Sequence, residues 1–219
     1  MTASARTSAP EASGGEVARI GPNAAIQLIA ALRHRGEDEA LLRLFRNAGL
    51  ERWLDHPPER MIDQAAAARL HVGLRRELPP AEAEAALAEA GRLTAAYLLA
   101  HRIPRPIRWI FKCLPARLSA SLLSRSIRRH AWTFAGAGRF EGRVGRSAQF
   151  TLHDNPLCAG ERSDAPVCVW HAQVFEKLFR ALVSPRARAR ETSCLARGDA
   201  FCQFEVEWAP SKRATPRTR

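Results

Sequence analysis

Four of the five cysteines lie in the last third of the chain, where their spacing could bring several sulfur atoms to one metal ion. Two of them, Cys194 and Cys202, flank a turn at 197–199, and Cys168 begins a predicted helix whose dipole would favour a thiolate. Glu191 precedes Cys194 by three residues. Zinc accepts thiolate and carboxylate ligands at four tetrahedral positions. We therefore predict a zinc site formed by Cys168, Glu191, Cys194 and Cys202.

The same cysteines have other interpretations. Free cysteine often behaves as a small, buried apolar residue, and two of these thiols could form a redox pair. An iron–sulfur cluster that also used Cys158 is conceivable, but the spacings match no ferredoxin-like pattern. Residues three apart on a regular strand point to opposite faces, so Glu191 and Cys194 converge only at a bulge or strand end. Spacing alone leaves these alternatives open.

A second group of candidate residues combines an imidazole, aromatic rings and arginines near the middle of the chain. An imidazole can ligate a metal centre, aromatic rings can stack on a planar ligand, and guanidinium groups bind carboxylates in a bidentate manner. The alternative is that the aromatic residues belong to the core and that the others are ordinary surface residues. The candidate ligand-binding residues are His130, Trp132, Phe134, Arg128, Arg129 and Arg139.

The elements that must position these residues change type along the chain. Apolar residues at helical spacing come first, and they predict helices that begin at 23 and that cover 38–47, 59–76, 81–101 and 116–134. Alternating patterns then predict strands at 139–144, 148–153, 189–196 and 201–208, with a helix over 167–183 between them. The predicted fold class is α+β: N-terminal helices followed by an antiparallel sheet with one inserted helix and a C-terminal hairpin.

Length and composition indicate a single domain. The chain has 219 residues, 46% of them hydrophobic, which is enough for a substantial core. We predict a disordered lead at 1–18, one domain at 19–208 and a basic disordered tail at 209–219. No apolar run approaches the ~18 residues of a membrane span, and the first residues do not resemble a secretion signal. Five cysteines without such a signal favour the cytoplasm.

The charge of the chain is positive and unevenly distributed. The formal net charge is +12, and residues 101–150 contain eleven Lys/Arg against one acid, Glu141, which gives 11 − 1 = +10. Such a segment attracts nucleic acid, anionic lipid headgroups or acidic small molecules, or it is a solvated arginine-rich face. No nucleic-acid-binding motif accompanies it, so we expect no nucleic-acid partner. The amphipathic helix predicted at 116–134 either packs on the domain or lies on a membrane surface.

Several segments resemble the 4-vinyl reductase domain: GRVGRSAQFTLHDNPLC, CVWHAQVFEKLFRALV and ETSCLARGDAFCQFEVEW. RHAWTFAGAGRF and the Asn-Pro-Leu-Cys turn are similar to the bacteriochlorophyll 4-vinyl reductase (BchJ) family in particular. The resemblance covers roughly residues 20–208. It implies a ligand-binding fold shared with trafficking-complex subunits. It also implies a zinc site, because phenol-sensing relatives bind zinc through a Cys followed by Glu-x-x-Cys-x7-Cys, matched here by Cys168, Glu191, Cys194 and Cys202. Four protein ligands leave no open position, so this zinc is expected to be structural.

The family name implies reduction of a vinyl group on a divinyl (proto)chlorophyllide, which needs a source of hydride or electrons. Gly136, Gly138 and Gly142 miss the dinucleotide-binding fingerprint, and no flavin or iron–sulfur motif is visible. The resemblance therefore implies first an accessory carrier of a Mg-tetrapyrrole intermediate. Second comes the vinyl reductase itself with an external electron donor, and third a small-molecule sensor module. The implied partners are a Mg-porphyrin, bacteriochlorophyll-pathway enzymes and a second copy in a homodimer, with peripheral contact to the inner membrane left open.

Overall fold

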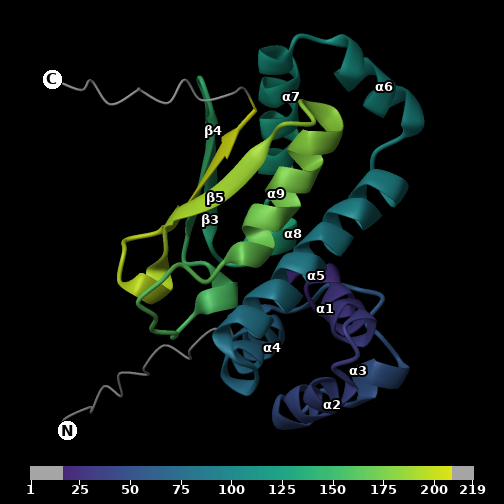
Figure 1. Cartoon of the computed structure of the whole chain (residues 1–219), viewed down its shortest axis with the longest axis vertical. Helices are drawn as coiled ribbons and strands as arrows, with labels where there is room; N and C mark the ends of the chain where they lie inside the picture. Colours follow the sequence, from purple (N-terminus) through teal and green to yellow (C-terminus); the bar gives the residue numbers. More distant parts are fainter. Residues whose placement is uncertain (1–16, 209–219) are drawn as a thin grey trace, which may run out of the picture.

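The computed structural model describes residues 17–208, in which helices fill the N-terminal part and a four-stranded antiparallel sheet follows (Figure 1). One long helix is inserted within the sheet, and the last two strands form a hairpin. The predicted α+β fold class is confirmed. The predicted tail at 209–219, and the predicted lead apart from residues 17 and 18, lie outside the described residues.

The helices that precede the sheet begin where the sequence supplies a helix start. Pro104 and Pro115 stand immediately before two of them, and Pro80 opens a third, because proline is tolerated in the first turn. The Asp63 side chain caps another by accepting a hydrogen bond from the Ala65 amide at 2.8 Å. Among the described residues, no helix is both long and apolar enough to cross a membrane. The helices are α1 (Asn23–His34), α2 (Asp38–Asn47), α3 (Arg52–Asp55), α4 (Gln64–Glu77), α5 (Pro80–His101), α6 (Arg105–Cys113), α7 (Ala116–Arg129) and α8 (Trp132–Ala135).

Two segments of this helical part differ from the prediction. The helix expected over 116–134 is divided into α7 and α8, and the apolar residues of α7 lie on two sides: Leu123 and Ile127 are buried, whereas Leu118 and Leu122 are exposed. The helix expected from 59 starts at 64, because residues 62–63 form the short strand β2 (Ile62–Asp63), which pairs with β1 (Arg19–Ile20). Two-residue strands are too short to produce an alternating sequence pattern.

The main sheet has the strand order β3-β4-β6-β5, with every neighbouring pair antiparallel. Side chains alternate between its faces, so Phe150 pairs with Phe204 and Leu152 with Cys202 on the buried side. The predicted inward face of the last strand, from Cys202 to Trp208, is buried as expected. The strands are β3 (Arg139–Val144), β4 (Ala148–His153), β5 (Arg188–Ser193) and β6 (Cys202–Glu207).

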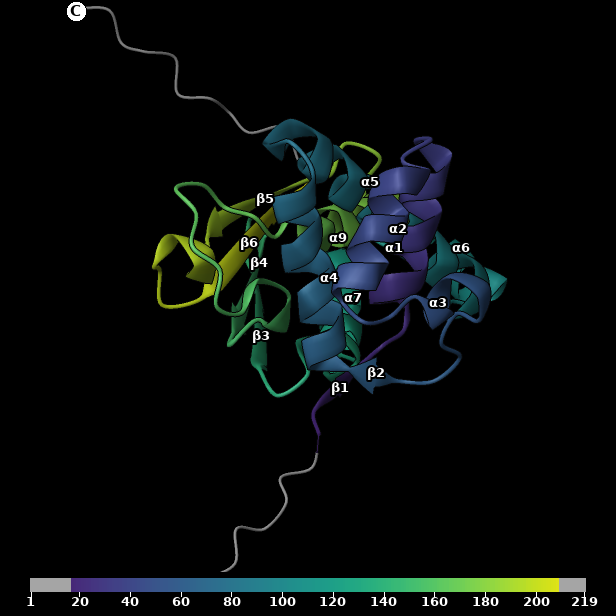
Figure 2. The same cartoon turned by 90° about the horizontal axis from the view of Figure 1, so that it is seen from below.

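The inserted helix α9 (Val169–Leu182) lies between the sheet and the long helix α5, so the domain is built in layers (Figures 1 and 2). The contact between α5 and α9 is close at Gly91, where an added Cβ would lie 2.4 Å from the Trp170 carbonyl oxygen. Only glycine permits this approach. Because Trp170 lies in the first turn of α9, this contact also fixes the position of Cys168, the residue that directly precedes α9.

His71 on α4 is buried in this core with a polar ring. Its Nε2 lies 3.0 Å from the Ala24 carbonyl oxygen, and its ring meets the Trp170 ring edge-on. Burial, together with the charge of Arg75 nearby, lowers the pKa of His71 to about 3, although the hydrogen bond with Ala24 acts in the opposite direction. The neutral His171 ring is the other titratable group near it. His71 is therefore neutral in the folded protein at pH values where an exposed histidine takes up a proton.

We expect this burial to make the protein sensitive to acid. The unfolded chain protonates His71 near pH 6.5, whereas the folded protein resists protonation until about pH 3, so the unfolded state binds more protons between these values. The free energy of unfolding should fall by up to ~1.4 kcal/mol per pH unit from this residue as the pH decreases. His71→Gln should reduce the pH slope by about that amount in urea unfolding between about pH 7 and pH 4.5. Equal slopes in the two proteins would contradict the prediction.

Candidate metal centre

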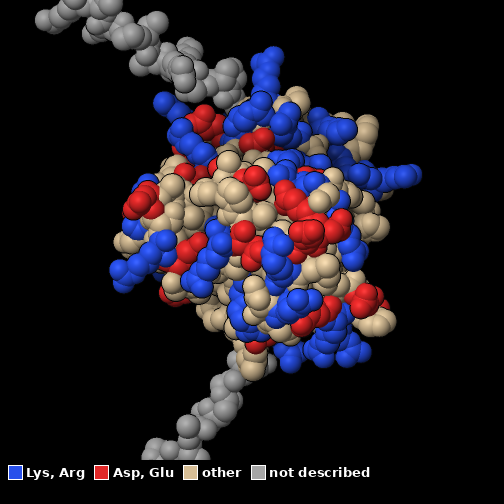
Figure 3. All heavy atoms as spheres, turned by 60° about the horizontal axis from the view of Figure 1, so that its bottom comes forward, with Lys and Arg blue, Asp and Glu red and all other residues tan. Residues whose placement is uncertain are grey.

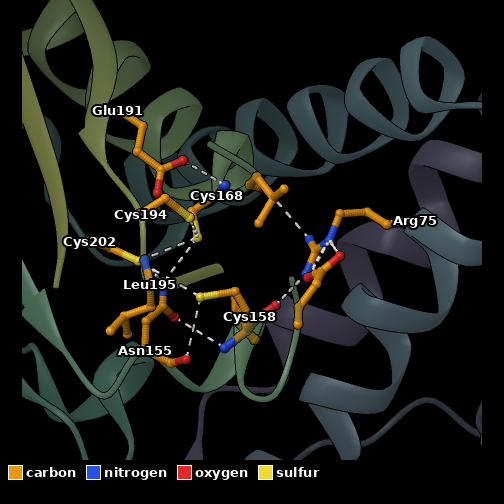
Figure 4. Close-up of polar contacts among 11 residues, drawn as sticks. Arg75, Asn155, Cys158, Cys168, Glu191, Cys194, Leu195 and Cys202 are labelled. Atoms are coloured by element: carbon orange, nitrogen blue, oxygen red, sulfur yellow. Dashed lines mark hydrogen bonds and ion pairs between the residues drawn. The ribbon is translucent and has the colours of Figure 1, made fainter. Parts of the chain in front are cut away.

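Four cysteine sulfurs meet at the end of the sheet that lies beside the start of α9 (Figure 4). Cys158 ends the short turn η1 (Pro156–Cys158) after β4, and Cys168 directly precedes α9. Cys194 follows β5, and Cys202 is the first residue of β6. All four are buried, and their sulfur atoms lie within 4.8 Å of one another. Three separate segments of the chain thus place their thiols at one point.

The spacing of the sulfurs fits a tetrahedral metal ion. The Sγ–Sγ distance is 3.7 Å from Cys202 to Cys158, 3.7 Å from Cys202 to Cys168, and 3.9 Å from Cys168 to Cys194. Four thiolates around zinc, at the usual zinc–sulfur distance, are separated by about 3.8 Å. Four sulfur ligands in this geometry suit zinc or iron. The cluster can therefore bind a metal ion without a rearrangement of its backbone.

Polar hydrogens point at these sulfurs. Asn155, in the turn after β4, directs its Nδ2 to the sulfur of Cys168 at 3.2 Å and to that of Cys202 at 3.4 Å. The backbone amide of Leu195 also donates to the Cys202 sulfur, at 3.4 Å. The Asn155 side chain is itself held, because its Oδ1 accepts from the Leu157 amide at 3.1 Å. Donors of this kind orient metal ligands and stabilise thiolate charge.

The close sulfurs change one another's acidity. Hydrogen bonds with Cys158 and Cys194 raise the pKa of Cys168 well above its usual value, and hydrogen bonds with Cys158 and Cys168 lower the pKa of Cys194. The sequence favoured a thiolate at Cys168 because of the helix dipole, but the neighbouring sulfurs outweigh that dipole. Negative charge therefore gathers on Cys194, and a bound cation would allow the other thiols to ionise.

Glu191 lies beside the cluster and holds one of its members. Its Oε2 accepts a hydrogen bond from the Cys168 amide at 2.7 Å, and its buried Oε1 has no hydrogen-bond partner within residues 17–208. Burial, followed by the charge of Cys194, raises the pKa of Glu191 to about 9. The strand pairing shifts between Glu191 and Ser193, the irregularity that convergence of Glu191 with Cys194 was expected to need. Its carboxylate is not among the ligand atoms that gather within 4.8 Å, whereas the Cys158 sulfur is.

An ion pair anchors two of the cysteine-bearing segments to α4. Arg75 and Glu161 are both only 11% exposed, and Arg75 Nη2 lies 2.5 Å from Glu161 Oε2. The same guanidinium donates to the carbonyl oxygens of Leu157 at 2.6 Å and Val167 at 3.4 Å. These carbonyls belong to the residues directly before Cys158 and Cys168. One side chain thus positions two of the four sulfurs (Figure 4).

The ligand-binding candidates from the middle of the chain do not converge. Phe134 is half-buried and packs edge-on against Phe140, with ring centroids 5.0 Å apart. By contrast, Trp132 is 59% exposed, and the exposed His130 places its Nδ1 2.9 Å from the carbonyl oxygen of Ser126. The three arginines are exposed, one of them in an ion pair with Glu141: Arg128, Arg129 and Arg139. Their role in ligand binding stays a prediction.

The sequence did not single out His171, in the first turn of α9, although its environment is unusual. The residue is 1% exposed, and neither ring nitrogen has a hydrogen-bond partner among the described residues. Its ring lies among aromatic rings, with centroids 4.9 Å from Trp170, 5.5 Å from Phe204 and 6.0 Å from Phe134. The buried indole nitrogen of Trp170 is also without a partner there. The pattern of α9 predicted a core-facing helix but could not show which polar groups would lack partners.

Comparison with a family model gives a match to the 4-vinyl reductase domain over residues 148–208. This segment contains β4, the inserted helix, the hairpin and all four clustered cysteines.

Solved structures give weaker similarity. The phenol-responsive sensory domain of the transcription activator PoxR aligns with a TM-score of 0.48 and 15% identity over 68% of this chain and 77% of that one. Subunit 3 of a trafficking protein particle complex from Naegleria fowleri, bound covalently to palmitic acid, aligns with a TM-score of 0.49 and 12% identity over 67% of this chain and 95% of that one. Neither likeness is close enough to assign a ligand.

Two curated relatives match nearly the whole chain. The bacteriochlorophyll synthase 23 kDa chain of Cereibacter sphaeroides is 44% identical over 86% of this chain and 90% of its own length. The protein of the same name from Rhodobacter capsulatus is 40% identical over 90% of this chain and 91% of its own. Identity at this level, over this length, places the chain in the family of the bacteriochlorophyll synthase 23 kDa chain.

Proposed function

We propose that this protein takes part in bacteriochlorophyll biosynthesis as an accessory carrier that binds a Mg-tetrapyrrole of the divinyl protochlorophyllide or chlorophyllide type. The observation that carries the proposal is the identity of 44% and 40% with two bacteriochlorophyll synthase 23 kDa chains. Each is named as one chain of a synthase, which favours a component that serves other enzymes of the pathway. We further propose that the protein is a cytoplasmic homodimer, peripheral to the inner membrane.

We propose His171 as the residue that contacts the pigment. A buried imidazole with two unpartnered nitrogens is costly unless a ligand or water satisfies it. A ring nitrogen can ligate magnesium, and the neighbouring Phe134, Phe175 and Phe204 offer flat apolar surfaces to a macrocycle. Among the residues that the sequence suggested for this role, Phe134 is the one whose ring packs against His171.

A titration of the purified protein with a Mg-divinyl porphyrin tests the carrier role. We expect saturable one-to-one binding with a shifted Soret band, and at least a roughly tenfold weaker affinity in His171→Leu because a polar contact is lost. Arg139→Ala is the matched control, since Arg139 lies exposed on β3 and away from this ring. The absence of binding at micromolar protein would contradict the carrier role. Equal affinity in His171→Leu would remove only the residue assignment.

We propose that the bound metal is zinc and that its role is structural. Cys168, Cys194 and Cys202 would supply three ligands, and either Cys158 or Glu191 the fourth. A zinc ion with four protein ligands joins the segments that carry them and has no open position for a substrate. In this protein it would join η1, the start of α9 and the hairpin β5–β6.

The vinyl reductase itself, supplied by an external electron donor, is the second candidate function. The specific observation in its favour is the set of four sulfurs, which suits an iron–sulfur cluster as well as zinc. Visible absorption by the purified protein, together with a reduced vinyl product on addition of a reductant, would favour the reductase. A colourless zinc protein that binds pigment without converting it would favour the carrier.

A further inference from the structure

The segment formed by α6 and α7 exposes large apolar side chains. Six of the eight exposed large apolar residues in the described part of the chain lie between residues 107 and 132. Five of these are on α6 and α7: Ile107, Trp109, Ile110, Leu118 and Leu122. Trp109 is the most exposed of all, at 68%. Clusters of this kind on a soluble domain mark an interaction surface.

Helix α6 has two distinct faces. No residue of α6 is buried, and only Phe111 packs against the core as a half-buried side chain. Pro106, Trp109, Ile110 and Cys113 follow one another at helical spacing on one side. The opposite side carries the basic residues of the helix, Arg105, Arg108 and Lys112. The helix is thus amphipathic, but its apolar side faces largely outward.

The helix is also held in place. The Ser119 hydroxyl on α7 donates a hydrogen bond to the Phe111 carbonyl oxygen at 2.8 Å, which ties the end of α6 to α7. Pro104 and Pro115 limit α6 at its two ends. In Figure 1, α6 lies at the upper right edge of the molecule, away from the sheet. The exposed apolar side is therefore a fixed feature of the fold.

The charge around this surface has one sign. Residues 102–129 contain eight Lys/Arg and no Asp or Glu, and none of the eight has an ion-pair partner among residues 17–208. Elsewhere the charges are mixed: the face in Figure 3, which includes the lower side of Figure 1, has acidic and basic side chains interspersed. The eight residues are Arg102, Arg105, Arg108, Lys112, Arg117, Arg125, Arg128 and Arg129.

We propose that α6 and the exposed side of α7 dock on the surface of an anionic lipid bilayer. Tryptophan and aliphatic side chains enter the boundary between headgroups and acyl chains, and arginine and lysine bind lipid phosphates. A second copy of the chain fits this surface poorly, because a symmetric interface would bring two unpaired basic surfaces together. Anionic lipid supplies the missing negative charge. This docking does not depend on pigment binding and is tested separately from it.

Flotation of the full-length protein with vesicles tests the docking. We expect binding to phosphatidylcholine vesicles that contain phosphatidylglycerol, little binding to phosphatidylcholine alone, and weakening by salt. Reversal of the basic side of α6 (Arg105→Glu, Arg108→Glu, Lys112→Glu) should weaken binding by on the order of a hundredfold. Trp109→Ala with Ile110→Ala, which leaves the charge unchanged, should weaken it by on the order of tenfold.

The matched control reverses three exposed arginines far from α6 in the sequence, Arg46, Arg52 and Arg60, by the same number of charges. An equal loss in this control would overturn the proposal, because net charge alone would then explain binding. No flotation at low salt would also overturn it. So would a change from dimer to monomer in Trp109→Ala/Ile110→Ala, since a second copy would then occupy the surface.

Unchanged thermal melting of the variants shows that they fold. A second measurement needs no substitution: Cys113 is exposed, whereas the other four cysteines are buried. An environment-sensitive dye on Cys113 of the metal-loaded protein should shift its emission to the blue with anionic vesicles. An unchanged emission would contradict the proposal.

Discussion

Cys202→Ser should release the bound metal and lower the stability of the whole domain. The Cys202 sulfur lies 3.7 Å from the sulfurs of both Cys158 and Cys168, and it receives hydrogen bonds from Asn155 and Leu195. Loss of this ligand should reduce the metal content from one ion per chain to near zero. With metal at about a thousand times its dissociation constant, the free energy of unfolding should fall by about 4 kcal/mol. Elemental analysis and urea unfolding measure the two effects.

Cys113→Ser is the matched control, because Cys113 is the one exposed cysteine and lies on α6, outside the cluster. It should keep both metal and stability. Elemental analysis also names the metal, since zinc and iron give different reports on the carrier and the reductase. Unchanged metal content and stability in Cys202→Ser would contradict the site.

Two further variants identify the fourth ligand. In cobalt-substituted protein, the thiolate-to-metal absorption increases with the number of bound thiolates. If Cys158 is a ligand, Cys158→Ser should weaken this absorption, whereas Glu191→Gln should leave it unchanged and lower metal affinity by roughly 10- to 100-fold as a loss of outer support. The reverse pattern would make Glu191 the ligand. The sequence pattern favoured Glu191, whereas the positions of the sulfur atoms favour Cys158.

The hairpin and the inserted helix could be predicted because their signals are local. Alternation from Cys202 to Trp208 indicates a strand with one buried face, and the apolar spacing around Phe175 and Phe179 indicates a buried helix. Both signals lie within short stretches of chain. The same reasoning placed Cys194 and Cys202 close together, on the two sides of the turn between β5 and β6.

The part of the site that could not be predicted depends on contacts between distant segments. Cys158 joins the cluster because its turn is held by Arg75, which lies more than eighty residues earlier in the chain. Asn155 was interpreted only as a turn residue, and its contact with two sulfurs depends on where α9 and β6 are placed. The exposure of Leu122 on α7 likewise follows from which side of that helix the sheet covers, which periodicity alone does not determine.

Arg75→Leu should destabilise the protein by about 3–5 kcal/mol, because it leaves the carboxylate of Glu161 buried without a partner. The same change removes the donors to the carbonyl oxygens of Leu157 and Val167. Since these residues precede Cys158 and Cys168, metal affinity should fall as well, although no metal ligand is altered. Urea unfolding of the metal-free and metal-loaded proteins separates the two losses.

The double variant Arg75→Leu/Glu161→Leu distinguishes a buried unpaired charge from lost positioning. Replacement of both partners removes the unpaired carboxylate, so much of the stability of the metal-free protein should return. Metal affinity should remain low, because neither leucine holds the Leu157 and Val167 carbonyls. Arg75→Lys should give an intermediate result, since lysine keeps the charge but cannot reach Glu161 and two carbonyls in the fixed geometry of a guanidinium. Full recovery of metal affinity in the double variant would mean that Arg75 stabilises the fold without positioning the cysteines.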